Sequence, residues 1–193
     1  MIITIARQCG CGAINVGKLL AEHYGIPFYT RKSLLEMARE RGVLDEMEAF
    51  FDERPVDELL FAMSSYGESH HLLTEKPLRT LADMVGEENC VIIGRCGNYI
   101  FRHRKDLVSV FLKGSLDARI ANIQVEQNLS AEEAKEFVEH VDDCRVAYHK
   151  YYTDLTWGNA DDYDICLDCD RLGAEQTAAM IEHYVKEVGS KTE

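Results

Sequence analysis

Two glycines, Gly10 and Gly12, lie between an apolar run and a helical pattern near the start of the chain. The apolar run covers residues 2–5, and the apolar spacing typical of a helix begins near Ile14. A glycine-rich turn between a strand and a helix can direct main-chain N–H groups at an anion, and the helix N-terminus adds a partial positive charge. The spacing therefore predicts a loop that binds phosphate groups.

A GxxxxGK pattern at residues 12–18 is a poor match to this loop. It would leave residues 19–24, about two turns, for the helix that follows. Leu19 also stands where the pattern requires serine or threonine. We therefore expect the loop to begin earlier, at Arg7.

In this register the usual cation of a phosphate loop is missing. Ala13 takes the place of the lysine that reaches the β- and γ-phosphates, and Ile14 takes the place of the hydroxyl residue that binds magnesium. Arg7 is the nearest substitute, because a guanidinium binds phosphate through two parallel hydrogen bonds. The predicted phosphate-binding residues are Arg7, Gly10, Cys11, Gly12, Ala13 and Ile14.

The rest of the chain alternates strand and helix patterns. Apolar runs typical of buried strands cover residues 90–93, 107–112 and 163–167. Helices are expected over much of residues 32–86, after Ser115, after the capping-box pattern that begins at Ser130, and at the C-terminus, with a loop at residues 64–74. Strands that are apolar throughout and alternate with helices indicate a parallel sheet covered by helices on both faces. We therefore predict one three-layer α/β domain over residues 1–193, with its ligands at the carboxyl ends of the strands.

The composition limits the classes of partner. The chain has 193 residues and a formal net charge of -13, which argues against a nucleic-acid or anionic-membrane surface. It shows no apolar run long enough to span a bilayer and no signal-peptide pattern, so we expect a cytosolic protein. The seven cysteines are expected to be free thiols.

Two cysteine pairs raise the question of a metal site. Cys9 and Cys11 lack the usual zinc-site spacing, and Cys166 and Cys169 lie at the end of a run typical of a buried strand. We expect both pairs to fill small apolar spaces, and we expect no metal ligands among the protein side chains.

Taken together, several stretches of the chain resemble the cytidylate-kinase-like family. They include residues 2–12, 26–29, 91–97, 142–145, 148–153, 157–158 and 163–167. The resemblance implies a P-loop nucleoside-monophosphate-kinase fold, with a helical acceptor-binding segment at about residues 32–86 and lid-like helices at about residues 115–150. It also places Arg95 and the Asp142–Arg145 pair at the site of the acceptor phosphate.

This resemblance predicts ATP-dependent phosphoryl transfer to a nucleoside monophosphate, CMP or dCMP, or to a similar phosphorylated acceptor. The expected cofactors are ATP and magnesium, the metal being held mainly by phosphates and water. The expected catalytic residues are Arg7, Arg95, Arg145 and Arg119, and the expected acceptor-binding residues are Arg95, Asp142 and Arg145. Aromatic residues between Tyr148 and Tyr163 are expected mainly to pack the last strand.

Four departures from the family pattern leave alternatives open. Ala13, Ile14, Cys96 and Glu36 replace residues that bind phosphate, magnesium or acceptor in true cytidylate kinases. These changes motivate a second hypothesis, a nucleotide-binding sensor or pseudokinase without significant turnover. In a third, the glycines are plain turns and Arg95 forms a structural ion pair with Asp142. A homo-oligomer also stays open.

Overall fold

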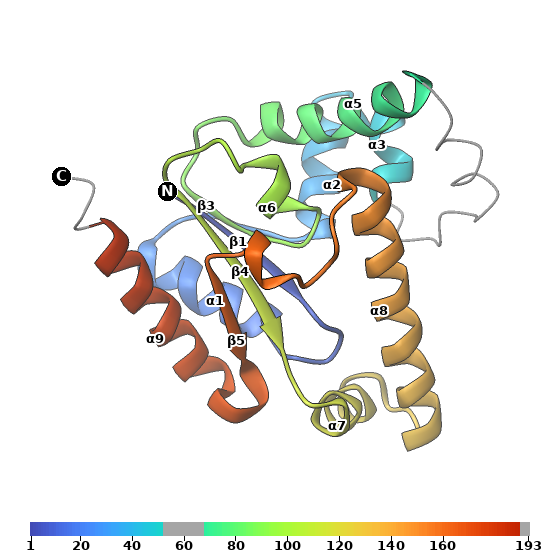
Figure 1. Cartoon of the computed structure of the whole chain (residues 1–193), viewed down its shortest axis with the longest axis vertical. Helices are drawn as coiled ribbons and strands as arrows, with labels where there is room; N and C mark the ends of the chain where they lie inside the picture. Colours follow the sequence, from blue (N-terminus) through green and yellow to red (C-terminus); the bar gives the residue numbers. More distant parts are fainter. Residues whose placement is uncertain (52–67, 190–193) are drawn as a thin grey trace.

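The computed structural model describes residues 1–51 and 68–189 and centres on one parallel sheet (Figure 1). The five strands lie in the order β2-β3-β1-β4-β5, and every pairing is parallel. They are β1 (Ile2–Arg7), β2 (Phe28–Tyr29), β3 (Cys90–Ile93), β4 (Leu107–Lys113) and β5 (Ile165–Asp168). The predicted three-layer fold is confirmed, with β1 at the centre of the sheet.

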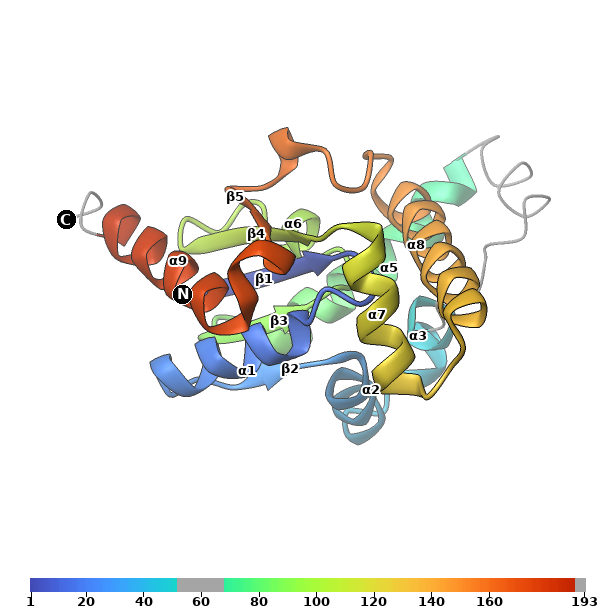
Figure 2. The ribbon, with the colours of Figure 1, turned by 90° about the horizontal axis from the view of Figure 1, so that it is seen from below.

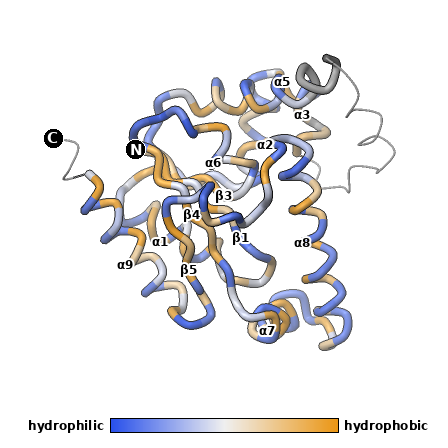
Figure 3. The backbone as a smooth tube through the Cα atoms, in the orientation of Figure 1, coloured by the Kyte–Doolittle hydropathy of each residue, from blue (hydrophilic) through white to orange (hydrophobic). Residues whose placement is uncertain are grey.

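Alternate residues of the central strands enter two separate cores, one on each face of the sheet. Ile3 and Ile5 of β1 belong to one core, and Ile2 belongs to the other. Figure 3 shows these strands as hydrophobic segments in the middle of the molecule. This burial on both faces explains why the strands are apolar throughout rather than alternating with polar residues.

Two helices cover the first face. They are α1 (Ala13–Tyr24) and α9 (Cys169–Gly189), which pack on each other and on the sheet. Gly25 ends α1, as its position after the last apolar residue of the helix predicts. Because α1 continues directly from the loop after β1, its N-terminus points at the carboxyl edge of the sheet.

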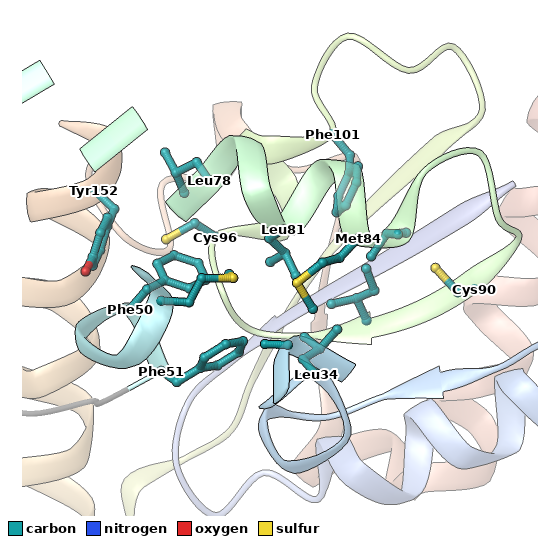
Figure 4. Close-up of a cluster of buried hydrophobic side chains, with 14 of the residues drawn as sticks. Leu34, Phe50, Phe51, Leu78, Leu81, Met84, Cys90, Cys96, Phe101 and Tyr152 are labelled. Carbon is teal, nitrogen blue, oxygen red and sulfur yellow. The ribbon is translucent and has the colours of Figure 1, made fainter. Parts of the chain in front are cut away.

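The second face carries a larger helical layer, made of α2 (Arg31–Glu40), α3 (Leu44–Phe51), α5 (Glu68–Val85), α6 (Gly97–Ile100) and part of α8 (Ala131–Thr153). Figure 4 shows Phe50 beside Tyr152 and Cys96 in this core. The rings of Phe50 and Tyr152 meet edge to face with centroids 5.0 Å apart. A second aromatic group joins Phe111 to Trp157 and Tyr163, close to the short 3-10 helix η1 (Ala160–Asp162). These aromatic residues pack, as expected, but Tyr148 and Tyr152 pack on Phe50 of α3 and not on the last strand.

A helix pair closes the carboxyl edge of the sheet. Helix α7 (Leu116–Gln127) follows β4, and α8 runs back past it, as Figure 2 shows. The Ser115 hydroxyl caps α7 by accepting from the Ala118 amide, and Ser130 and Glu133 form the predicted capping box of α8. The pair occupies the segment predicted to be lid-like.

Some predicted boundaries are wrong. Strand β1 continues to Arg7, two residues further than its apolar run, because β4 pairs with it along its whole length. Helix α5 begins at Glu68, inside the segment expected to be a loop, since polar residues without glycine or proline are compatible with a helix. Strand β5 begins at Ile165. Cys166 is exposed and does not fill an apolar space as expected, because its side chain points to the face of β5 opposite to Ile165 and Leu167, which pack in the core. The apolar stripe expected at residues 56–63 lies outside the described residues. None of the described helices is long and apolar enough to span a membrane.

Candidate active site

The predicted phosphate loop occupies residues 8–12, between β1 and α1. Gly10 and Gly12 have φ values of 78° and 69°, a conformation that glycine adopts at little cost. The Gly12 carbonyl accepts from the Asn15 amide at 3.0 Å and begins α1, so the helix starts at Ala13 as predicted. The GxxxxGK pattern therefore lies largely within the helix and is not the loop.

The loop presents main-chain donors to a groove of about 490 Å³. Within the described part of the chain, the amides of Gly10, Cys11 and Gly12 have no hydrogen-bond acceptor. The exposed Ile14 side chain lies at the same groove, while the Cys11 thiol is buried and donates to the Gln8 carbonyl. The facing wall comes from the helix pair and consists of Ile123, Glu126, Gln127, Phe137, Val141 and Arg145. The arrangement suits an anion with an attached organic group.

Two main-chain carbonyl groups of the loop accept hydrogen bonds from side chains of α7. Asn122 Nδ2 donates to the Gly10 carbonyl at 2.8 Å, and Arg119 Nη1 donates to the Cys9 carbonyl at 3.2 Å. The packing at Gly10 is so close that an added Cβ would lie 2.4 Å from the Arg119 carbonyl oxygen. Glycine at this position therefore serves both the positive φ and the approach of α7.

Asp142 joins the loop to two arginines. Its Oδ1 accepts from the Cys9 amide at 2.7 Å, its Oδ2 lies 2.6 Å from Arg119 Nη1, and its Oδ1 lies 3.5 Å from Arg145 Nη1. The carboxylate thus accepts a hydrogen bond from one amide of the loop. The next three amides, those of Gly10, Cys11 and Gly12, remain without an acceptor among the described residues. Asp142 pairs with these arginines and not with Arg95, so the Arg95–Asp142 ion pair of the third, structural alternative does not form.

The second arginine-bearing segment, residues 94–97, turns sharply after β3. Gly94, Arg95 and Cys96 all have positive φ, at 75°, 57° and 54°. Left-handed conformations cost about 1–2 kcal/mol for residues with a Cβ, and such strain is concentrated at functional sites. The φ of 75° explains the glycine at the start of this turn, and the end of the Arg7 side chain, 2.4 Å from the position that a Cβ on Gly94 would take, lies close beside it.

Arg95 is buried beneath this turn. Its Nη1 donates to the Phe50 carbonyl at 2.8 Å, and its guanidinium carbon lies 5.4 Å from the centre of the Tyr148 ring. These contacts come from α3 and α8, so the helical layer of the second face holds the guanidinium. The buried Cys96 thiol beside it has its pKa raised to about 12 by burial, so it stays protonated.

Three of the four predicted arginines meet at a smaller cavity of about 30 Å³. Arg7, Arg95 and Arg145 all line it, and Arg7 and Arg145 also line the groove. Arg145 Nη1 donates to the Arg7 carbonyl at 3.2 Å, which fixes the two residues together. Arg119 lines neither space, because its guanidinium is held by Asp142 and by the Cys9 and Gly114 carbonyls.

Sequence reasoning missed Thr4, His149 and Asn122. Thr4 and His149 line the small cavity, and Asn122 holds the loop. A signal for Thr4 was present, since it is the one polar residue in an otherwise aliphatic run. His149 falls within the family-like stretch at residues 148–153, but no role was predicted for it.

His149 is buried and uncharged. Burial lowers the pKa of its imidazole to about 4, and the nearby Asp162 carboxylate opposes this shift only in part. The unfolded chain therefore takes up a proton between about pH 6.5 and 4 that the folded chain does not. Folding stability from this group is complete near neutral pH and is lost as the pH falls through that range.

We expect the free energy of unfolding to fall by about 2 kcal/mol from this group alone between pH 7.5 and pH 5. The measurement is urea unfolding of the wild type and His149→Gln at both pH values. The variant should lose less stability than the wild type by that amount, whereas His183→Gln, which alters an exposed histidine, should match the wild type. An equal pH effect in the wild type and His149→Gln would contradict the prediction.

Comparison with known proteins relates this geometry to a family. Residues 2–171 match the model of the cytidylate kinase-like family. A cytidylate kinase of Methanopyrus kandleri is 23% identical over 94% of this chain and 91% of its own. Two solved structures share the fold, and each alignment covers 96% of this chain and 98% of the other. They are an uncharacterized protein from Eubacterium ventriosum (TM-score 0.75, 24% identity) and shikimate kinase from Bacteroides thetaiotaomicron (TM-score 0.52, 16% identity).

The family model covers most of the chain, including the loop after β1, the turn after β3 and the Asp142–Arg145 pair. The chain therefore belongs to the cytidylate kinase-like family.

Proposed function

We propose that this protein transfers a phosphoryl group from ATP to a nucleoside monophosphate, with CMP and dCMP the favoured acceptors. Family membership and the names of the curated relatives support kinase chemistry. The observation that carries the proposal is the junction of the groove and the small cavity at Arg7 and Arg145. Two phosphorylated molecules bound on either side would meet at these two guanidinium groups.

The groove is the proposed donor site. Its volume of about 490 Å³ falls within the range of small-molecule sites, roughly 300–1,000 Å³. The open amides of the loop and the N-terminus of α1 would bind the donor phosphates. Arg7 and Arg145 would supply the positive charge that the missing lysine provides in other phosphate loops.

The acceptor phosphate would lie on the other side of the same arginines. Arg95 is held there by the Phe50 carbonyl, so we assign α3 and the neighbouring helices α2 and α5 to the acceptor side. Phosphoryl transfer needs little covalent chemistry from the protein; it needs aligned reactants and neutralised charge. Arg145 is placed for both tasks because it contacts both spaces and is oriented by Asp142.

The side chains of the loop offer few oxygen ligands for magnesium. Ile14 has no side-chain oxygen where a hydroxyl residue binds the metal in other phosphate loops. The ion would therefore be held mainly by donor phosphate oxygens and water, as its octahedral preference allows. When bound, it would neutralise part of the charge on the donor phosphates.

A coupled assay of ADP release with magnesium ATP and a panel of nucleoside monophosphates tests the proposal. We expect acceptor-dependent turnover and a fall in kcat/KM of about 100- to 1,000-fold for Arg145→Ala, by analogy with the loss of one donor to a transition-state oxyanion. Arg171→Ala is the control, because Arg171 is an exposed residue of α9 and lines neither the groove nor the small cavity. Its turnover should match the wild type.

Two other results would replace the proposal. Tight nucleotide binding without turnover for any acceptor would favour the sensor or pseudokinase hypothesis. No thermal shift with any nucleotide would leave the loop as a structural turn.

A further inference from the structure

Uncharged polar residues line the small cavity beneath residues 94–97 together with the arginines. Thr4 reaches it from the central strand β1, and His149 reaches it from α8 one turn beyond Arg145. Both residues are almost fully buried, with 2% and 3% of their surface exposed. Asn98 and Trp157 complete its polar and aromatic wall. The cavity therefore joins the arginine cluster to uncharged hydrogen-bonding side chains.

Unpaired polar atoms are concentrated at this cavity. In the described part of the chain, four buried side-chain polar atoms lack a hydrogen-bond partner, and three of them belong to residues that line it. These three atoms are Thr4 Oγ1, His149 Nε2 and Arg145 Nε. Buried polar groups in folded proteins are normally paired, because an unpaired one loses its bonds to water without replacement. Three such atoms at one cavity mark a place where a polar group of a bound molecule can form hydrogen bonds.

The chemistry of the three atoms defines that ligand. Arg145 Nε can only donate, so the group it meets must carry a lone pair. Thr4 Oγ1 can donate or accept, and His149 Nε2 can do either according to its tautomer. A hydroxyl or carbonyl oxygen can accept from Arg145 Nε and can also pair with Thr4 or His149, whereas a ring-attached amino group, whose lone pair is delocalised, cannot accept from Arg145.

Size and charge restrict the ligand further. One water molecule needs about 10–15 Å³ of such volume, so a cavity of about 30 Å³ accepts one or two groups of that size and no ring. His149 is neutral, so the cations that attract a phosphate are the guanidinium groups of the arginines. A substituent would thus enter the cavity while the body of the molecule stays at its mouth.

We propose that this cavity binds one uncharged oxygen of the acceptor, a hydroxyl or a carbonyl, and that Thr4 and His149 select acceptors that carry it. The inference rests on the proposed transfer reaction, and it adds a specificity site to the phosphate-binding arginines. It predicts that an acceptor lacking this oxygen leaves three buried groups unpaired and reacts more slowly.

The test compares acceptors in the wild type, Thr4→Val and Thr4→Ser. Thr4→Val keeps the shape of the side chain and removes its hydroxyl, and Thr4→Ser restores the hydroxyl. The panel contains CMP, its 2′-deoxy and 3′-deoxy analogues, which each lack one sugar hydroxyl, and AMP, whose base has no carbonyl. The quantity compared is the ratio of kcat/KM for CMP to that for each analogue.

In the wild type, one analogue should react about 10- to 100-fold less well than CMP, and that analogue identifies the oxygen. Thr4→Val should reduce this ratio to about 3-fold or less by lowering kcat/KM for CMP alone. Thr4→Ser should leave the ratio at its wild-type value. A Thr4→Val protein that folds, as judged by thermal unfolding, and slows every acceptor equally would overturn the inference in favour of a structural role. The inference would also be overturned if Thr4→Val lowered kcat/KM for no acceptor.

Calorimetric titration of the same nucleotides separates this inference from the proposed reaction. If the wild type turns over no acceptor but still binds CMP more tightly than one analogue, and Thr4→Val loses that preference, only the transfer reaction fails. If the wild type and Thr4→Val bind every nucleotide of the panel equally, the specificity site fails whether or not turnover occurs.

Discussion

Replacement of Asp142 by alanine is expected to lower the free energy of unfolding by about 3–5 kcal/mol, because it leaves a buried cation without its counter-charge. The Arg119 and Asp142 side chains are only 9% and 16% exposed, so solvent screens their ion pair weakly. The Cys9 amide loses its acceptor in the same step. For a chain of this length, the loss corresponds to a fall in Tm of about 10 °C. Thermal and urea unfolding measure it.

Two further variants make the expectation specific. Asp143→Ala changes the next residue of α8, which is exposed, and should alter stability by less than about 0.5 kcal/mol. Asp142→Asn keeps an oxygen for the Cys9 amide but removes the charge, so its loss should lie between those of the two alanine variants. Equal stability of Asp142→Ala and Asp143→Ala would show that Asp142 does not hold the loop to α7 and α8.

Replacement of Gly10 by alanine is expected to separate the loop at residues 8–12 from α7 and to abolish most of the proposed transfer activity. The added Cβ would lie 2.4 Å from the Arg119 carbonyl oxygen, a main-chain atom that cannot rotate away. The positive φ and the overpacking together should cost about 3 kcal/mol of stability. A displacement of about 1 Å at a reacting group can cost roughly 100-fold in rate, so we expect at least that loss of kcat/KM. Coupled ADP release and urea unfolding test both effects.

Two other glycines with similar positive φ values provide controls for this variant. Gly12 and Gly42 have φ values of 69° and 70°, and an added Cβ at either position meets nothing within 4 Å. Gly12→Ala and Gly42→Ala should each lose only about 1 kcal/mol, the cost of the left-handed conformation. If Gly12→Ala matched Gly10→Ala in stability, backbone strain alone would account for the loss and the packing of α7 on the loop would carry none of it.

Much of the fold follows from local patterns in the sequence. The apolar runs at β1, β3 and β4 predicted buried parallel strands, because strands covered on both faces need no polar residues. Ser115 and Ser130 marked the starts of α7 and α8, since their hydroxyls satisfy amides that the helix leaves free. The boundaries of β5 and α5 were less predictable, because an edge strand and a polar helix carry weak patterns.

The conformation of the loop after β1 could also be predicted from the sequence, because all its parts are adjacent in the chain. Gly10, Gly12 and the start of α1 lie within a few residues, and the positive φ values that glycine allows are local properties. The missing lysine at Ala13 followed from the same register. The resemblance to a family added Arg95 and the Asp142–Arg145 pair, although not the contacts that they make.

The sequence alone therefore determined the strands, the caps and the loop, which depend on neighbouring residues, while the tertiary structure decided the partners of each charged and polar group. Asp142 meets the Cys9 amide across 133 residues, and besides Arg145 it pairs with Arg119, which no sequence pattern had linked to it. Thr4 and His149 meet at one cavity because β1 and α8, which lie far apart in the chain, contribute to the same core. Such contacts depend on the packing of whole elements, so no local spacing in the chain specifies them.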